Sequence, residues 1–258
     1  MIGAIGVVVA SNDEACLARN LLASEMIAGQ GVVVHVERGA PSAAIAYNRG
    51  LDATTAPIVI FAHQDVYFPR GWEMRLARAI AAVEAIDPDW ALMAPFGMAE
   101  DTAAYRGDVW TTSLSRRVGE PARTPVMAQS FDELVIVLRR ASGVRFDEGL
   151  PLYHLYGTDI VQTARAAGKG AWVADLPVVH NDGFHDRLRA DFTAGYDYVR
   201  RKWRARLPLR TSVLWITWHG LSLPLHRLRG ARSIAKRRAV AGDTGVDPRL
   251  YAARCGWE

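Results

Sequence analysis

Short apolar runs alternate with amphipathic stretches along the first hundred residues. Four runs have the length and composition of strands buried on both faces. They are residues 5–9, 32–36, 57–61 and 90–95. Three stretches with helical spacing of apolar residues separate them, at 14–27, 43–53 and 72–86. This alternation predicts an α/β protein with a mostly parallel central sheet and helices on both of its faces.

The second half of the chain is less regular. Residues 98–129 contain few long apolar runs, so we expect loops and short strands there. The pattern then predicts one further strand, one helix and two short strands. These are residues 132–139, 157–168, 171–173 and 177–180. After residue 191 the chain is expected to be helical and basic.

Composition favours one ordinary globular domain. The chain has 258 residues, of which 50% are hydrophobic and 22% are charged, which is enough for one sizeable core. We predict one folded domain over residues 1–190 that binds the ligands, and a basic helical extension over residues 191–258. Cys16 and Cys255 are far apart in sequence and form neither a disulfide framework nor a CxxC metal motif. Together with a start that lacks the features of a signal peptide, this favours a reducing, cytoplasmic location.

Positive charge is concentrated near the end of the chain. The formal net charge is only +4, yet residues 200–238 contain many Arg and Lys and no Asp or Glu. Such a segment suggests a partner with phosphates, or a solvated basic helix face. Its Trp203, Trp215 and Trp218 could contact a membrane interface on the cytoplasmic side, since the segment is too interrupted to span a bilayer. The alternative is that these side chains pack on the domain or on a second subunit in a homodimer.

Polar clusters follow three of the predicted strands. They are Ser11-Asn12-Asp13, Glu37 and His63-Gln64-Asp65. In an open α/β sheet, ligands bind beyond the carboxyl ends of the parallel strands. A carboxylate at that edge, such as Asp65, could bind Mg²⁺ or Mn²⁺. Taken alone, an aspartate at a strand end is more often a helix cap or a residue of a surface turn than a metal ligand.

Several other functions lack their motifs. No GxGxxG follows the first strand, and the chain has neither a GxxxxGK[ST] loop nor a GxSxG elbow. Nothing around the basic segment matches a nucleic-acid reading motif, so we expect no nucleic-acid partner.

Two segments resemble glycosyltransferases with the GT-A fold. The first, AYNRGLDATTAPIVIFAHQDVYFPRGW, resembles the helix, strand and D-x-D-like motif of the first half of that fold. The second, FDEGLPLYHLYGTDIVQTARAAGKGAWVADLPVVHNDG, resembles the half around the acceptor site. The resemblance covers about residues 3–185. It is closest to a family-2-like bacterial group, of the streptomycin-biosynthesis type, in which HQD stands in place of D-x-D.

The resemblance implies a function and its ligands. It implies transfer of a sugar from a nucleoside-diphosphate sugar to an acceptor hydroxyl, assisted by Mn²⁺ or Mg²⁺. Asp65 would bind the metal with His180, unless His180 is a core or turn histidine. The implied nucleotide pocket consists of Ser11, Asn12, Asp13, Glu37, Asn48, His63 and Gln64, with His63 near the ribose or diphosphate. The acceptor is unknown, and the basic segment suggests a lipid-linked or cell-envelope glycan.

One catalytic position departs from the family pattern. Many inverting members carry an acidic pair near the acceptor hydroxyl, and here Gly157 replaces one of the two acids. Asp159 remains as the candidate general base, although it could also cap the following helix. Asp147, Glu148 and His154 are alternatives. The missing acid keeps a second hypothesis open, a non-catalytic GT-A-like module that binds a nucleotide sugar or a partner.

Overall fold

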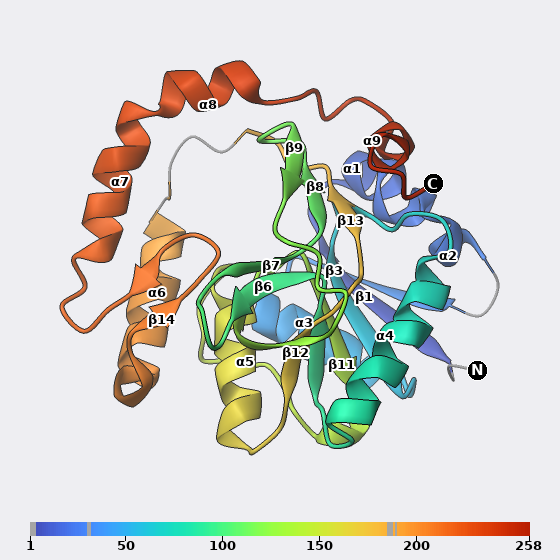
Figure 1. The fold of residues 1–258 in the computed structure, drawn as a ribbon, viewed down its shortest axis with the longest axis horizontal. Helices are drawn as coiled ribbons and strands as arrows, with labels where there is room; N and C mark the ends of the chain where they lie inside the picture. The colour runs from blue at the N-terminus through green and yellow to red at the C-terminus, as the bar shows by residue number, and fades with distance from the viewer. Residues whose placement is uncertain (1–3, 30–31, 185–187, 189) are drawn as a thin grey trace.

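A nine-stranded sheet forms the centre of the computed structural model, which describes residues 4–29, 32–184, 188 and 190–258 (Figure 1). The strand order is β2-β1-β3-β11-β5-β12-β10-β6-β7. In that order the strands are Val32–Arg38, Ile5–Ser11, Ile58–His63, Val135–Arg139, Leu92–Ala94, Ala171–Val173, Val126–Phe131, Phe96–Ala99 and Tyr105–Gly107. The α/β class expected from the sequence is therefore confirmed.

The sheet is mixed, so the expectation of mostly parallel pairing needs correction. β1 pairs in parallel with β2 and β3, and β5 with β12. β11 lies between β3 and β5 and is antiparallel to both, and the β12-β10-β6-β7 edge is also antiparallel. The apolar run in β11 reports burial on both faces, and burial carries no information on strand direction.

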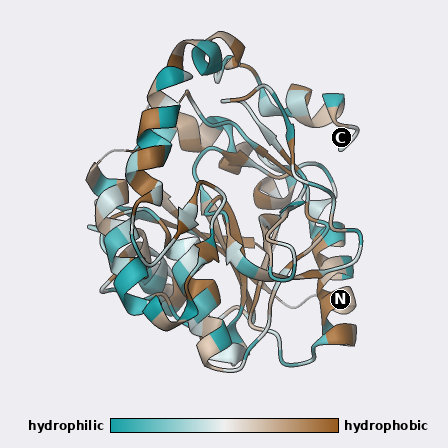
Figure 2. Ribbon diagram, turned by 60° about the vertical axis from the view of Figure 1, so that its left-hand side comes forward, coloured by the Kyte–Doolittle hydropathy of each residue, from teal (hydrophilic) through white to brown (hydrophobic). Residues whose placement is uncertain are grey.

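Helices cover both faces of the sheet, as expected. α3 (Ala43–Ala53) and α5 (Tyr156–Ala166) pack on the face that Val8 and Phe61 supply. α4 (Trp72–Ile86) packs on the opposite face, and both α3 and α4 have the predicted bounds. In Figure 2 the interior strands are mainly hydrophobic, whereas hydrophobic and hydrophilic residues alternate along the outer helices.

Gly50 lets α3 approach the sheet closely. A Cβ atom at this position would lie 2.2 Å from Cγ1 of Val8. This approach brings the Tyr47 side chain of α3 under the end of β3.

The stretch 14–27 is divided where one helix was expected. It forms α1 (Glu14–Arg19), the 3-10 turn η1 (Leu21–Ala23) and α2 (Glu25–Ala28). Asn20 lies at the break and is fully buried. Its side chain donates to the carbonyl oxygen of Cys16 and accepts from Asn181, so tertiary hydrogen bonds replace a helical turn here.

A second sheet of four short strands lies at the end of β3. Its order is β4 (Val66–Tyr67), β13 (Val178–His180), β8 (Val109–Thr111) and β9 (Arg116–Val118). β13 pairs with β4 so that His180 is opposite Val66. This pairing places the late histidine beside the HQD motif.

The basic C-terminal region divides into packed and peripheral parts. α6 (Ala190–Lys202), the turn η3 (Arg204–Arg206) and the hairpin β14 (Leu209–Arg210) with β15 (Trp215–Ile216) add Phe192, Tyr196, Val199, Leu207, Leu209, Leu214 and Ile216 to the core. α7 (Ser222–Arg232) and α8 (Ile234–Val240) lie along the periphery (Figure 1). The domain boundary at residue 190 stays a prediction, although residues just after it help to form the core. Within the described residues, no helix is long and apolar enough to cross a membrane.

The end of the chain returns to the second sheet. α9 (Pro248–Arg254) contributes Tyr251 and Ala252 to a small core with Tyr67, Val179 and Trp257. The ring of Tyr251 stacks on Trp110 with a centroid separation of 5.2 Å. The C-terminus therefore supports the strands that carry Asp65 and His180.

Candidate metal centre and cavity

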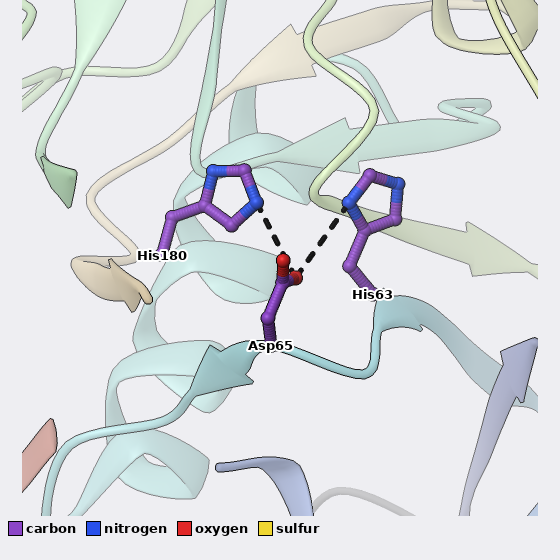
Figure 3. A group of neighbouring side chains, drawn as sticks. All are labelled: His63, Asp65 and His180. Atoms are coloured by element: carbon purple, nitrogen blue, oxygen red, sulfur yellow. Dashed lines mark ion pairs between the residues drawn. The ribbon is translucent and has the colours of Figure 1, made fainter. Parts of the chain in front are cut away.

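His63, Asp65 and His180 converge at the carboxyl end of β3 (Figure 3). Oδ1 of Asp65 lies 3.4 Å from Nε2 of His180 and 3.9 Å from Nδ1 of His63. One ligand atom from each side chain can be chosen so that all three lie within 4.8 Å of one another. Two imidazole nitrogens and a carboxylate oxygen at this spacing can hold a divalent cation.

A turn after β3 and a long-range backbone contact bring the three side chains together. β3 ends at His63, Gln64 and Asp65 form a turn, and β4 begins directly after Asp65. The backbone N–H of Asn181 donates to the carbonyl oxygen of Asp65 at 2.8 Å, which holds the end of β13 against this turn.

A hydrogen-bond chain orients the His63 ring. Nε2 of His63 lies 2.7 Å from the Tyr156 hydroxyl, which itself donates to the carbonyl oxygen of Glu133 at 2.8 Å. Because the single hydroxyl proton of Tyr156 is used on Glu133, Nε2 of His63 is the donor. In the neutral ring Nδ1 then carries the lone pair, and Nδ1 is the nitrogen that faces Asp65.

The three side chains shift one another's pKa values. Burial acts to raise the pKa of Asp65, but the nearby His180 and His63 outweigh it and hold that pKa well below its usual range. Burial acts to lower the pKa of His180, but the charges of Asp65 and Asp182 raise it to about 10. Burial lowers the pKa of His63. Oδ1 of Asp65 is buried and makes no hydrogen bond of normal geometry with the described residues, which suits an oxygen that meets a cation.

A cavity of about 1040 Å³ is lined by all three of these side chains. Much of its wall is apolar, with Phe96, Tyr105, Phe131, Phe184, Phe192 and Val213. Its acidic and basic members besides the cluster include Asp132, Glu133, His154, Asp182 and Asp191. The volume is at the upper end of the range typical of small-molecule sites.

His154 faces this cavity between two carboxylates. Nε2 of His154 lies 3.5 Å from Oδ2 of Asp191, and Nδ1 lies 3.9 Å from Oε2 of Glu133. Burial and the charge of Asp132 raise the pKa of Glu133 well above its usual range.

Backbone strain occurs on both sides of His154. Leu152 and Leu155 have φ angles of 63° and 67°, in the left-handed region that leucine rarely adopts. Such conformations persist only where packing over-determines them and cluster at functional sites. The buried Leu155 directly precedes α5, so the strained turn sets where the helix begins and how the preceding histidine is placed.

The residues expected around the nucleotide form a network of their own at the end of β1. Oε1 of Gln64 accepts from Oγ of Ser11 at 2.9 Å and from the backbone N–H groups of Asn12 and Asp13. Nε2 of Gln64 donates to Oδ1 of Asn12, and Asp13 caps α1 through the N–H of Cys16. Gln64 thus holds the β1 loop close to the candidate metal cluster, and none of these four residues lines the cavity.

Glu37 and Asn48 differ in their surroundings. Glu37 lies within β2, near its end, and its Oε1 is 2.6 Å from Nε2 of His35. Asn48 is buried, donates to Glu148 and to the carbonyl oxygen of Phe146, and accepts from the N–H of Phe146. Both N–H groups of its amide tie α3 to the 146–148 loop, which leaves no donor for a nucleotide.

The structure places Asp159 away from the cavity. Asp159 is 1% exposed, and its two oxygens accept from Nζ of Lys202 at 2.8 Å and from Nε1 of Trp203 at 2.7 Å. Asp147 accepts from the same Lys202 at 2.6 Å. The two carboxylates connect α5 and the preceding loop to α6. Asp159, the expected general base, therefore holds elements of the fold together. Burial raises the pKa of Asp159.

Gly157 shows why the acidic pair is incomplete. A Cβ atom at Gly157 would lie 2.7 Å from the carbonyl oxygen of Phe131. A carboxylate cannot occupy this position without a shift of the backbone. The departure from the family pattern is thus built into the packing of α5 against β10.

The sequence patterns assigned no role to several residues that the structure places at the site. Tyr156, Asp132, Glu133 and Asp182 reach the site through long-range contacts, for example Asp182 through Thr111 at 2.7 Å. A polar residue at or just beyond a strand end is a local signal for two of them, since Asp132 directly follows β10 and Asp182 lies two residues after β13. The sequence placed His63 near the nucleotide, whereas the structure places it with Asp65 and His180 in the candidate metal cluster.

Comparison with known proteins shows only distant similarity. No family model matches the chain. A curated protein of Fuscovulum blasticum, described as "ATP synthase subunits region ORF 6", is 28% identical over 155 residues, which cover 56% of this chain and 60% of that protein. The chain therefore spans less than two thirds of that relative.

Solved structures of similar shape include two associated with sugar nucleotides. GalNAc-T7 with UDP, GalNAc and Mn²⁺ has a TM-score of 0.49 at 12% identity, over 69% of this chain and 44% of that one. Mannosyltransferase PcManGT from Pyrobaculum calidifontis with GDP-Man and Mn²⁺ has a TM-score of 0.46 at 14% identity, over 99% and 80%. A197 from STIV has a TM-score of 0.44 at 10% identity, over 74% and 91%. Similarity this distant says nothing about the activity of this chain.

Proposed function

We propose that this protein is a metal-assisted glycosyltransferase that uses a nucleoside-diphosphate sugar. The observation that carries the proposal is the convergence of His63, Asp65 and His180 at a strand end, on the wall of a cavity large enough for a sugar and its acceptor. The motifs that resemble GT-A glycosyltransferases lie at this same place in the fold. The proposal gives these three side chains the role of metal ligands.

The donor set favours Mn²⁺ over Mg²⁺. Imidazole nitrogens suit transition metals, whereas Mg²⁺ prefers oxygen ligands and keeps several waters. A cation held here would supply positive charge to the diphosphate as it leaves. The orphaned Oδ1 of Asp65 and the Nδ1 lone pair of His63 both fit this role.

The nucleotide would bind at the carboxyl ends of β1 and β2. The loop at Ser11, Asn12 and Asp13 is held next to the cluster by Gln64, and Glu37 is the last residue but one of the neighbouring strand. Carboxylate and amide groups suit the edge of a base and the ribose hydroxyls. In this proposal Asn48 supports the pocket indirectly through the 146–148 loop.

We propose His154 as the general base in place of Asp159. It lines the cavity with the metal cluster, whereas Asp159 is buried in contacts with Lys202 and Trp203. Glu133 and Asp191 lie on either side of its ring and would stabilise the imidazolium that forms when His154 takes the acceptor proton.

One observation favours the second hypothesis, a binding module without activity. The acid expected as base is used structurally, and Gly157 cannot be an acid without backbone movement. Such a module would hold a nucleotide sugar at the same metal cluster but leave it intact.

Thermal unfolding with UDP, GDP and their sugar conjugates, with and without Mn²⁺, tests the binding step. A ligand that binds only the native state must raise the unfolding temperature. We expect a rise that needs both the nucleotide and the metal. Indifference to every nucleotide and metal pair would refute the proposed site.

Sugar-nucleotide hydrolysis then separates the two hypotheses. A transferase releases some nucleoside diphosphate in the absence of acceptor, and a binding module releases none. We propose that the acceptor is a lipid-linked or cell-envelope glycan on the cytoplasmic face of a membrane, because the basic segment beside the cavity suits an anionic surface.

A further inference from the structure

The helix α7 has two apolar sides. One packs on the domain, and the other is exposed among the described residues. Leu223 is 4% exposed and belongs to the main core. Arg227 donates to the carbonyl oxygen of Leu188 and to Oγ1 of Thr193, which also ties α7 to the start of α6. These contacts fix the helix on the molecule and leave its other side outward.

The outward side carries a continuous apolar stripe. Leu221, Leu225 and Leu228 follow one another at helical spacing and are 57%, 49% and 54% exposed. Trp218, in the turn before α7, is 57% exposed. An exposed apolar group of this kind on a well-packed domain marks an interaction surface.

Basic side chains flank this stripe without acidic partners. Arg229, Arg232 and Lys236 are exposed, and no Asp or Glu occurs in the sequence between Asp197 and Asp243. Among the described residues, none forms an ion pair with these three. We call Trp218, the three leucines and these three cations the α7–α8 face.

We propose that the α7–α8 face docks this protein on an anionic lipid bilayer. Leucine side chains would enter the acyl boundary and Trp218 would lie at the interface, while the cations contact lipid phosphates. Nucleic acid would satisfy the cations but offers no apolar surface for the leucines. A second copy of the chain would bring two strongly basic faces together, which repel.

A short stretch of chain links the cavity wall to the docking face. Thr211, Ser212 and Val213 line the cavity, and the chain then runs through β15 to Trp218. Docking through this face would hold the cavity near lipid-borne molecules. The inference that the acceptor hydroxyl belongs to a membrane lipid rests on the proposed glycosyltransferase function, whereas docking itself does not.

Vesicle flotation of the full chain tests the proposal. We expect binding to vesicles of phosphatidylcholine with 30% phosphatidylglycerol, taken as roughly the anionic content that draws polybasic segments, weak binding to phosphatidylcholine alone, and release by salt. The double variant Leu225→Glu/Leu228→Glu should lower the partition coefficient at least about tenfold, since two apolar side chains are lost from the interface. Arg232→Glu/Lys236→Glu should lower it by about 30-fold or more on anionic vesicles only.

The matched control is Met74→Glu/Ile86→Glu on α4, where both side chains are also exposed and apolar. This variant should bind vesicles like the original chain. Equal binding by all variants, or binding to neither vesicle type, overturns the proposal. So does a concentration-dependent dimer, measured by light scattering, that the leucine variants abolish. Retained nucleotide and Mn²⁺ binding in the leucine variants would show that the metal site is independent of docking.

Discussion

At the scale of single residues, the tautomer of His63 links the fold to the metal hypothesis. Tyr156 holds the ring through Nε2 and leaves Nδ1 for a cation next to Asp65. Asp65 lies in a turn that the end of β13 contacts, so its carboxylate is held in place before any ligand binds. Three substitutions separate the roles of these side chains.

Asp65→Asn keeps the size of the side chain and removes the charge that offsets a divalent cation. We expect the metal-dependent part of nucleoside-diphosphate binding to disappear with the fold intact, as measured by calorimetry with and without Mn²⁺. Asp52→Asn, which alters an exposed ion pair with Arg145, is the matched control and should bind normally. Unchanged metal dependence in Asp65→Asn would place the cation elsewhere.

Tyr156→Phe removes the hydroxyl that accepts from Nε2 of His63. Loss of such an outer hydrogen bond typically lowers metal affinity by about 10- to 100-fold. Titration of Mn²⁺ by electron paramagnetic resonance measures this affinity. Tyr198→Phe removes a hydroxyl that donates to Asp147 instead and should leave the affinity unchanged. Equal effects of the two changes would argue against a role for the Tyr156–His63 contact.

His154→Asn tests the proposed base. Loss of a general base lowers the rate by about 10²-fold or more while donor binding stays the same. Single-turnover transfer, together with nucleotide affinity, separates these two quantities. His219→Asn, a change at a histidine outside the cavity lining, should transfer at the normal rate. Normal transfer by His154→Asn would contradict its role as the base. The acids that line the cavity would then be the candidates, namely Asp132, Glu133, Asp182 and Asp191.

At the scale of elements, the contacts between α5 and the end of α6 give Asp159 structural partners. Asp159 follows the strained N-terminus of α5, which is where an acid near an acceptor would be expected. α6 then covers it with Lys202 and Trp203, which are 43 and 44 residues away in sequence. The sequence of α5 alone does not predict that α6 packs over Asp159.

Asp159→Asn should therefore reduce stability rather than chemistry. We expect the free energy of unfolding to fall by about 1–3 kcal/mol, because a buried charge-assisted contact is lost while Lys202 keeps its bond to Asp147. Urea unfolding measures this change, and transfer per folded molecule should be unaffected. A stable variant with a rate about 10²-fold lower would restore Asp159 as the base.

At the scale of the whole molecule, the last residues of the chain support the first half of the site. Trp257 is 6% exposed and packs with Tyr67, Val179 and Tyr251. The first two belong to β4 and β13, which directly adjoin Asp65 and His180. The metal cluster thus depends on chain segments from three distant parts of the sequence.

Trp257→Ala should cost about 3 kcal/mol of stability, the usual scale for deleting a large buried aromatic side chain. Because β13 loses a packing partner, Mn²⁺ affinity should also fall. Thermal unfolding and metal titration measure the two effects. Leu250→Ala on α9, where the side chain is 55% exposed, should change neither. Loss of stability with unchanged metal affinity would show that α9 stabilises the fold alone.

The sequence by itself determined the elements whose patterns are local. The bounds of α3 and α4, the apolar strands and the HQD turn at a strand end could all be read from spacing, because side-chain periodicity reports which faces are buried. The sequence could not reveal the direction of β11, the break at Asn20, the burial of Asp159 or the meeting of His180 with Asp65. Each of these depends on contacts between residues far apart in the chain, where the partner that a side chain meets decides whether it binds a ligand or holds the fold.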